Sequence, residues 1–220
     1  MAKIIPVKNG TTKETIAQKA SKLFKEKGFS ATSMRDIAEA FGVEAPSLYN
    51  HINSKKEILQ EICFKIANLF TMHINKVEVS GLPVLQKFEL IIRFHIHMML
   101  QEYQSVYISD HEWKHLPEPY LSNFKNQRKS YRIRLAKMIE QGIENKELKK
   151  IDPYVAVLTI LSAIGGIESW QHSKKSIDAR ALEENMVTIL LGGLKNNQDA
   201  NEAIPASIRS AGSKIITIKP

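Results

Sequence analysis

The sequence has almost no cysteine and no long hydrophobic run. Cys63 is the only cysteine among 220 residues, so an intramolecular disulfide is impossible, which is typical of proteins in a reducing cytosol. No run of about 18 apolar residues occurs, so we expect no membrane-spanning segment. The N-terminus also lacks an apolar stretch long enough for a signal peptide. These absences predict a cytoplasmic protein that has no membrane partner.

The sequence also lacks the alternation of apolar and polar residues that predicts β-strands, and it contains no internal repeats. Apolar residues instead recur at helical spacing, as Ile16, Ala20 and Phe24 do. The hydrophobic fraction of 43% is enough for a sizeable core. We therefore predict an all-α protein of about nine helices. Its parts are a helix-turn-helix head over residues 11–60, a larger helical body over 61–195, and a tail over 196–220.

Positive charge gathers near the N-terminus. The formal net charge is +8 and the isoelectric point is about 9.4. Residues 1–60 hold ten Lys and Arg against six Asp and Glu, so about a quarter of the chain carries half of the excess. Such an excess suggests a polyanionic partner, although many basic proteins bind none.

Turn and capping residues divide this basic region into short helices. Ser33 and Asp36 have the spacing of a capping box at the start of a second helix, and Gly42 is placed to end it. A third short helix is expected at about 45–51, directly after that glycine. Two helices joined by a tight turn form a helix-turn-helix, in which the second one enters the major groove of DNA. The spacing therefore predicts a DNA-binding head.

The third helix is too short for a core element and carries small or hydrogen-bonding side chains. We expect Leu48 and Ile52 to face inward and anchor it. The N-termini of the second and fourth helices present free backbone N–H groups, which suit phosphate. Ordinary capping residues of a helical bundle are the alternative, which the length of the combined pattern disfavours. The candidate DNA-binding residues are Thr32, Ser33, Ala45, Ser47, Tyr49, Asn50, His51 and Lys55.

The same stretch resembles the TetR/AcrR family of bacterial regulators. The resemblance covers about residues 11–60 without a gap. Three stretches carry it: residues 31–43 (ATSMRDIAEAFGV), 46–52 (PSLYNHI) and 54–59 (SKKEIL). It implies a homodimeric repressor that binds a near-palindromic operator and releases it when a small molecule enters the body. It further implies phosphate contacts at Thr32, Ser33, Tyr49 and Lys55, and base contacts at Ala45, Ser47 and Asn50.

Two residues depart from the family pattern. Glu44 stands where the family usually has Ser or Thr as a helix cap, and its charge would weaken phosphate binding unless it faces away. Ile52 replaces the usual Phe, which costs some packing but changes no chemistry.

The middle of the body mixes soft apolar and polar side chains. A pocket for a small-molecule effector needs that blend, with a concave apolar lining and a few polar anchors. Plain core is the alternative for each of these residues. The candidate ligand-binding residues are Phe94, His95, Met98, Met99, Tyr103, Tyr107, Trp113 and Trp170.

The end of the body is the expected dimer interface. By analogy with the family, helices near 153–171 and 179–194 would form a four-helix contact between two copies, and burial within one subunit is the alternative. Residues 112–116, with Trp170 and others downstream, faintly resemble regulators that sense acyl-coenzyme A thioesters. A basic face could meet the coenzyme A phosphates, with a solvated face as the alternative; its residues are Lys125, Arg128, Lys129, Arg132 and Arg134.

Residues 111–115 match the H-E-x-x-H pattern of zinc hydrolases. On a helix, this spacing places two histidines on one face for zinc, with Glu112 as general base and Glu140 as a conceivable third ligand. However, Pro117 and Pro119 interrupt the helix just after the motif, and no strand is available to hold a substrate. The zinc hydrolase is therefore the less favoured alternative. We expect no enzyme, no bound metal and no cofactor.

Overall fold

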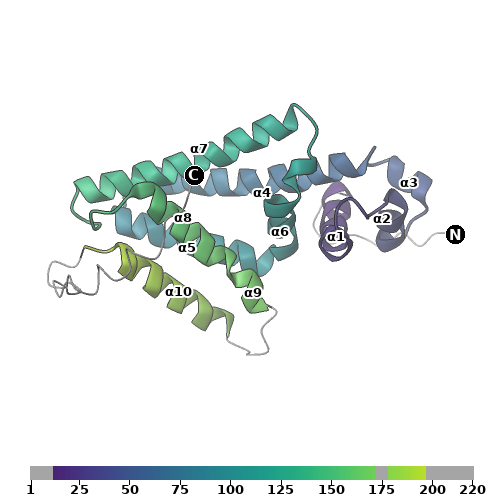
Figure 1. Ribbon diagram of the computed structural model, residues 1–220. Helices are drawn as coiled ribbons and strands as arrows, with labels where there is room; N and C mark the ends of the chain where they lie inside the picture. Colours follow the sequence, from purple (N-terminus) through teal and green to yellow (C-terminus); the bar gives the residue numbers. More distant parts are fainter. Residues whose placement is uncertain (1–11, 172–177, 197–220) are drawn as a thin grey trace, which may run out of the picture.

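The computed structural model describes residues 12–171 and 178–196, with Trp170 and Gln171 described in backbone only (Figure 1). This part of the chain is helical, apart from its loops and one isolated β-bridge between Leu148 and Lys195. The all-α prediction is therefore confirmed. The expected tail over 196–220 lies outside the described residues, except for Asn196.

The head lies at one end of an elongated molecule, and the long helix α4 connects it to the body (Figure 1). The head helices are α1 (Thr12–Lys27), α2 (Met34–Phe41) and α3 (Ala45–Tyr49), followed by α4 (Lys55–Glu78). The body helices are α5 (Val84–Gln101), α6 (Tyr103–His111), the 3-10 helix η1 (Trp113–His115), α7 (Tyr120–Glu144), α8 (Pro153–Gly165), α9 (Ile167–Gln171) and α10 (Ala179–Leu194).

Local signals set the ends of the head helices. The Ser33 hydroxyl accepts a hydrogen bond from the Asp36 N–H, and the Asp36 carboxylate accepts one from the Ser33 N–H, so the expected capping box forms. Gly42 ends α2 at φ 83°, a left-handed conformation that glycine adopts without strain. At the start of α4, the Ser54 hydroxyl accepts a hydrogen bond from the Glu57 N–H, while the Glu57 carboxylate accepts one from the Asn53 N–H.

The structure tests the two helices predicted for the end of the body. The helix expected near 153–171 is interrupted at Gly166, so α8 and α9 replace it. The helix expected near 179–194 forms as α10. No helix in the described ranges is both long and apolar enough to cross a bilayer.

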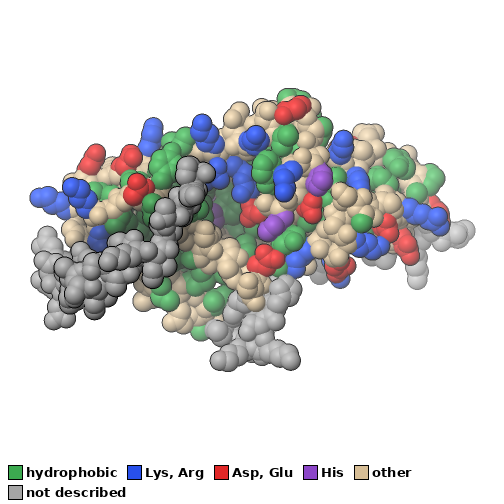
Figure 2. All heavy atoms as spheres, viewed as in Figure 1, with side chains coloured by type: hydrophobic (Ala, Val, Ile, Leu, Met, Phe, Trp, Pro, Cys, Tyr) green, Lys and Arg blue, Asp and Glu red, His purple; other side chains and the backbone are tan. Residues whose placement is uncertain are grey.

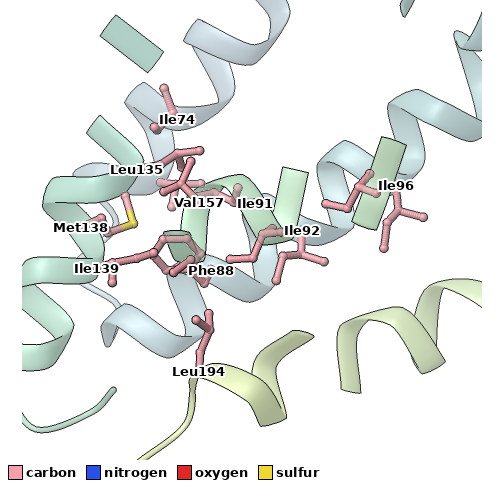
Figure 3. Packing of buried hydrophobic residues seen from close by; sticks show 14 of the residues in the cluster. Ile74, Phe88, Ile91, Ile92, Ile96, Leu135, Met138, Ile139, Val157 and Leu194 are labelled. Carbon is pink, nitrogen blue, oxygen red and sulfur yellow. The ribbon is translucent and has the colours of Figure 1, made fainter. Parts of the chain in front are cut away.

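Two apolar clusters form the core. The body cluster lies where α4, α5, α7, α8 and α10 meet, around Phe88, Ile92 and Ile139 (Figure 3). The head cluster gathers residues of α1 to α4 and is completed by three side chains of the body, Ile108, Leu116 and Phe124. The head therefore packs directly against α6 and α7.

Candidate DNA interface and ligand cavity

Helix α3 presents a polar face outward and an apolar face inward. Leu48 and Ile52 are fully buried, as expected for its anchors. Tyr49, Asn50 and His51 are exposed. Ala45 and Ser47 are half-buried on the same short helix, so all the predicted base-contacting side chains lie on α3 or at its C-terminal end.

Glu44 begins α3 as its N-cap. Its side chain is exposed and makes no capping hydrogen bond, so the departure from a Ser or Thr cap leaves this helix start without side-chain support. Pro46 lies in the first turn, where the missing N–H costs no intrahelical bond.

Thr32 and Ser33 differ in their access to a ligand. Ser33 is exposed at the N-terminus of α2. Thr32 is buried, and its hydroxyl donates to the Gly28 carbonyl oxygen at 2.8 Å. The Thr32 hydroxyl therefore closes the turn after α1, and a phosphate contact at Thr32 stays a prediction that its buried side chain does not favour.

The Lys55 ammonium group is already engaged within the head. It donates to the carbonyl oxygens of Phe29 at 2.8 Å, Ser30 at 2.9 Å and Thr32 at 2.9 Å. It also lies 4.8 Å from the centroid of the Phe29 ring. Three N–H donors meet three acceptors, so Lys55 ties the start of α4 to the loop that precedes α2. No local pattern reveals this contact, because the partners are more than twenty residues apart.

The other basic side chains of the head are partly engaged and partly free. Lys13 pairs with Glu57 at 3.1 Å and Lys27 with Asp36 at 2.7 Å. Among the residues that the structure describes, three exposed cations of the head make no hydrogen bond or ion pair. They are Lys22, Arg35 and Lys56.

The body encloses a cavity of about 560 Å³ between α4, α5, α6, α7 and α8. Its wall is mostly apolar, with Ile66, Phe70 and Leu161 among its residues. In Figure 2 the surface is hollowed beside α7, and Lys and Arg side chains gather near that hollow. The polar or charged lining residues are Thr71, His95, Ser109, Asp110, Gln127, Arg128, Tyr131, Arg132, Tyr154 and Ser162.

Two of the eight predicted ligand-binding residues, His95 and Met99, line this cavity. Phe94 instead stacks on His73, with ring centroids 4.0 Å apart, and Met98 is buried in the body core. Trp113 packs near Phe124, at 6.4 Å between centroids. Adjacent residues of α5 point in different directions, so only part of the predicted segment can face one space.

Two further candidates, Tyr103 and Tyr107, lie where the head meets the body. The Lys25 ammonium group of α1 lies 4.1 Å from the Tyr103 ring centroid and 5.4 Å from that of Tyr107. Neither tyrosine lines the cavity. Trp170 belongs to α9, but its side chain lies outside the described residues.

Helix α7 contributes four polar lining residues: Arg128 and Arg132 belong to the predicted basic face, whereas Gln127 and Tyr131 were not predicted. Gln127 and Tyr131 are four residues apart, as are Arg128 and Arg132, so all four share one side of the helix. The Arg128 guanidinium donates to Asp110 at 2.5 Å and to the Ser109 carbonyl at 3.2 Å. Arg132 is exposed, and within the described residues it makes no hydrogen bond or ion pair. The four-residue spacing of these side chains is visible in the sequence and could have added Gln127 and Tyr131 to the candidates.

The H-E-x-x-H match does not form a zinc site. Helix α6 ends at His111, and the motif continues into η1, so the continuous helix that the motif requires is absent. The Nδ1 atom of His111 hydrogen-bonds with the Tyr107 carbonyl at 2.9 Å, while His115 stacks on Phe29. The described residues contain no group of three His, Cys, Asp or Glu side chains placed to hold a metal ion.

Comparison with family models identifies the chain. Residues 16–62 match the model described as bacterial regulatory proteins of the tetR family, and residues 81–194 match a tetracyclin repressor-like C-terminal domain. The protein belongs to the TetR family. This family consists of transcriptional regulators and not of enzymes, so the head is a DNA-binding domain and the zinc hydrolase alternative is unsupported.

Named relatives of this TetR-family regulator are transcriptional repressors. It is 26% identical over 180 residues to the repressor KstR2 of Rhodococcus jostii, which covers 80% of this chain and 87% of the relative. It is 28% identical over 162 residues to IcaR, a negative regulator of the biofilm operon icaADBC in Staphylococcus aureus, with 72% and 81% covered.

Solved structures have the same fold. The ketosteroid regulator KstR2 of Mycobacterium tuberculosis gives a TM-score of 0.79 at 21% identity, covering 86% of this chain and 98% of that one. AibR, solved with isovaleryl coenzyme A and operator DNA, gives 0.72 at 22% identity, covering 81% and 97%.

Proposed function

We propose that the protein is a repressor that binds a near-palindromic operator as a homodimer and releases it when an amphipathic effector enters the body cavity. The outward polar face of α3, held by the fully buried Leu48 and Ile52, is the observation that carries the proposal. Only one face of this short helix is buried, so its exposed face can enter a major groove. Ser47 and Asn50 would contact bases, and Ser33 and Tyr49 would contact phosphates.

Exposed apolar side chains support dimerisation through α8 and α10. Tyr154, Val155 and Leu158 of α8 are 60%, 60% and 67% exposed and lie at the rim of the cavity, which they also line. Ile189 of α10, which does not line the cavity, is 71% exposed. A second copy would remove this apolar surface from water, which favours association. The two heads would then contact half-sites separated by about one or two DNA turns, at ~34–36 Å per turn.

The lining of the cavity favours an effector with an apolar part and an anionic part. Apolar side chains cover most of the wall. On one side, Arg132 adds a positive charge that has no partner among the described residues, whereas the charge of Arg128 is paired with Asp110. An acyl-coenzyme A thioester combines an apolar chain with phosphates that guanidinium groups bind well. The structure of the related AibR with isovaleryl coenzyme A is consistent with this ligand class.

A DNA mobility-shift experiment tests the proposal. The purified chain should shift DNA from the region upstream of its own gene, with an affinity that falls steeply as salt rises. Acyl-coenzyme A thioesters should release the DNA. Replacing Ile189→Asp should give a monomer in gel filtration and abolish the shift, whereas Lys137→Asp, at an exposed position on α7, should change neither. A wild-type chain that is monomeric and leaves this DNA unshifted would contradict the proposal.

A further inference from the structure

A neutral polar pair lies in the wall of the cavity. His95 of α5 and Tyr131 of α7 share a hydrogen bond of 2.8 Å between the histidine Nε2 atom and the phenol oxygen. The ring of Phe70, from α4, stacks on His95 with centroids 4.4 Å apart. All three side chains line the cavity, so the His95–Tyr131 pair is a polar group next to an aromatic ring in the cavity wall.

Both members of the pair are uncharged at neutral pH. Burial lowers the pKa of His95 to about 3, and the nearby His73 acts in the same direction. Burial also raises the pKa of Tyr131 above its ordinary value. The pair therefore offers hydrogen bonds without charge, unlike the arginines on the same side of α7.

One internal hydrogen bond leaves the pair with an unused donor. A neutral imidazole has one N–H and one bare nitrogen, and a phenol has one O–H. Their shared bond uses a single donor, so either the His95 N–H or the Tyr131 O–H remains, whichever tautomer is present. The Nδ1 atom of His95 has no partner among the described residues and is not sealed from solvent, in contrast to the enclosed Nδ1 atom of His73.

We propose that His95 and Tyr131 form a subsite for a neutral oxygen, either a carbonyl or a hydroxyl, on the apolar part of the effector. The effector class is then an amphipathic anion with an oxygenated apolar chain. An oxygen on the effector would accept a hydrogen bond from the spare donor. A plain hydrocarbon chain would leave that donor without a partner inside an apolar wall. This inference rests on the proposed function, because it requires the effector to occupy the cavity.

Calorimetric titration of the full chain with matched thioesters tests the subsite. The probes are decanoyl-coenzyme A and a panel of decanoyl-coenzyme A thioesters, each with one oxo group at a different position along the chain. We expect at least one oxo thioester to bind about tenfold more tightly than the plain one, as one added hydrogen bond implies. Both probe types carry the same phosphates, so the arginines contribute equally to each.

Conservative variants assign the preference to the pair. The double replacement His95→Phe with Tyr131→Phe should abolish the preference and leave binding of the plain thioester within about twofold of wild type. Tyr131→Phe alone removes only one oxygen but takes away the partner that fixes the tautomer and orientation of His95, so it should reduce the preference without abolishing it. It provides a test if the double variant does not fold. His97→Phe is the matched control, since His97 is exposed on α5 and does not line the cavity, and it should retain the full preference.

The outcomes separate the two proposals. A preference that the pair creates and the double variant loses supports the subsite. Equal binding of plain and oxo thioesters, or a preference that survives in both variants, overturns the subsite and leaves the proposed function intact. If no thioester binds the wild-type chain, the effector class in the proposed function fails and the subsite fails with it.

Discussion

The head is built around a closed core, whereas the body is built around a cavity. Phe24 of the head is 1% exposed and Ile16, Ile37 and Leu48 are fully buried. In the body, Phe70 is only half-buried, and it lines the cavity. A closed core fixes the shape of a surface that must match DNA, while a cavity leaves unfilled contacts that a ligand can make.

The largest expected effect compares the same substitution in both regions. Phe24→Ala should lower the free energy of unfolding by about 3–5 kcal/mol, because it empties a closed core. Phe70→Ala should cost roughly half as much, because part of that side chain has no packing partner to lose. Urea unfolding followed by circular dichroism measures both values. Equal costs would mean that the cavity wall is packed as tightly as the head.

The head could be predicted closely because its signals are local. Ser33 and Asp36 are three residues apart, and Gly42 directly ends the helix that they begin. The inward-facing Leu48 and Ile52 follow from helical spacing and were confirmed. Contacts that span the sequence were not predictable in this way. Lys55 caps carbonyls in a loop before α2, and no spacing rule connects those positions.

The cavity was harder to predict for the same reason. Its lining comes from five helices, so the residues that share it are set by how those helices cross. Composition favoured α5 but could not separate His95, which lines the cavity, from its neighbour Phe94, which does not. The four-residue spacing of Gln127 and Tyr131 shows that they share one side of α7. Only the arrangement of the helices shows that this side faces the cavity.

An effect of intermediate size distinguishes Lys55, which positions a loop, from a lysine that contacts phosphate. Lys55→Ala should lower the free energy of unfolding by about 1–2 kcal/mol, because three loop carbonyls lose a charged donor at a half-buried site. Operator binding should weaken, but its dependence on salt should stay unchanged. Lys56→Ala, at the exposed neighbouring position, should leave stability intact and reduce the salt slope by roughly one unit.

Parallel measurements of DNA affinity across a salt series, together with urea unfolding, decide this point. If Lys55→Ala lowers the salt slope and leaves stability unchanged, Lys55 contacts phosphate directly, as the family resemblance implies. The head would then rearrange its loop on binding DNA, which would weaken the contrast between a fixed head and an open body.

The smallest expected effect is a pH dependence confined to the head. The pKa of the Asp36 carboxyl is held well below its ordinary value, first by the hydrogen bond from Lys27 and then by those from Ser33. A carboxyl with a lowered folded pKa stabilises the protein above its unfolded pKa of about 4, and this contribution is lost as the pH falls further. Asp36→Asn should therefore reduce stability at neutral pH, and its difference from wild type should shrink on acidification below about pH 4.

Lys27→Met keeps the bonds from Ser33 and should remove only part of this pH dependence. A difference between Asp36→Asn and wild type that stays constant from neutral pH down to about pH 3 would show that the ionised cap does not stabilise the start of α2.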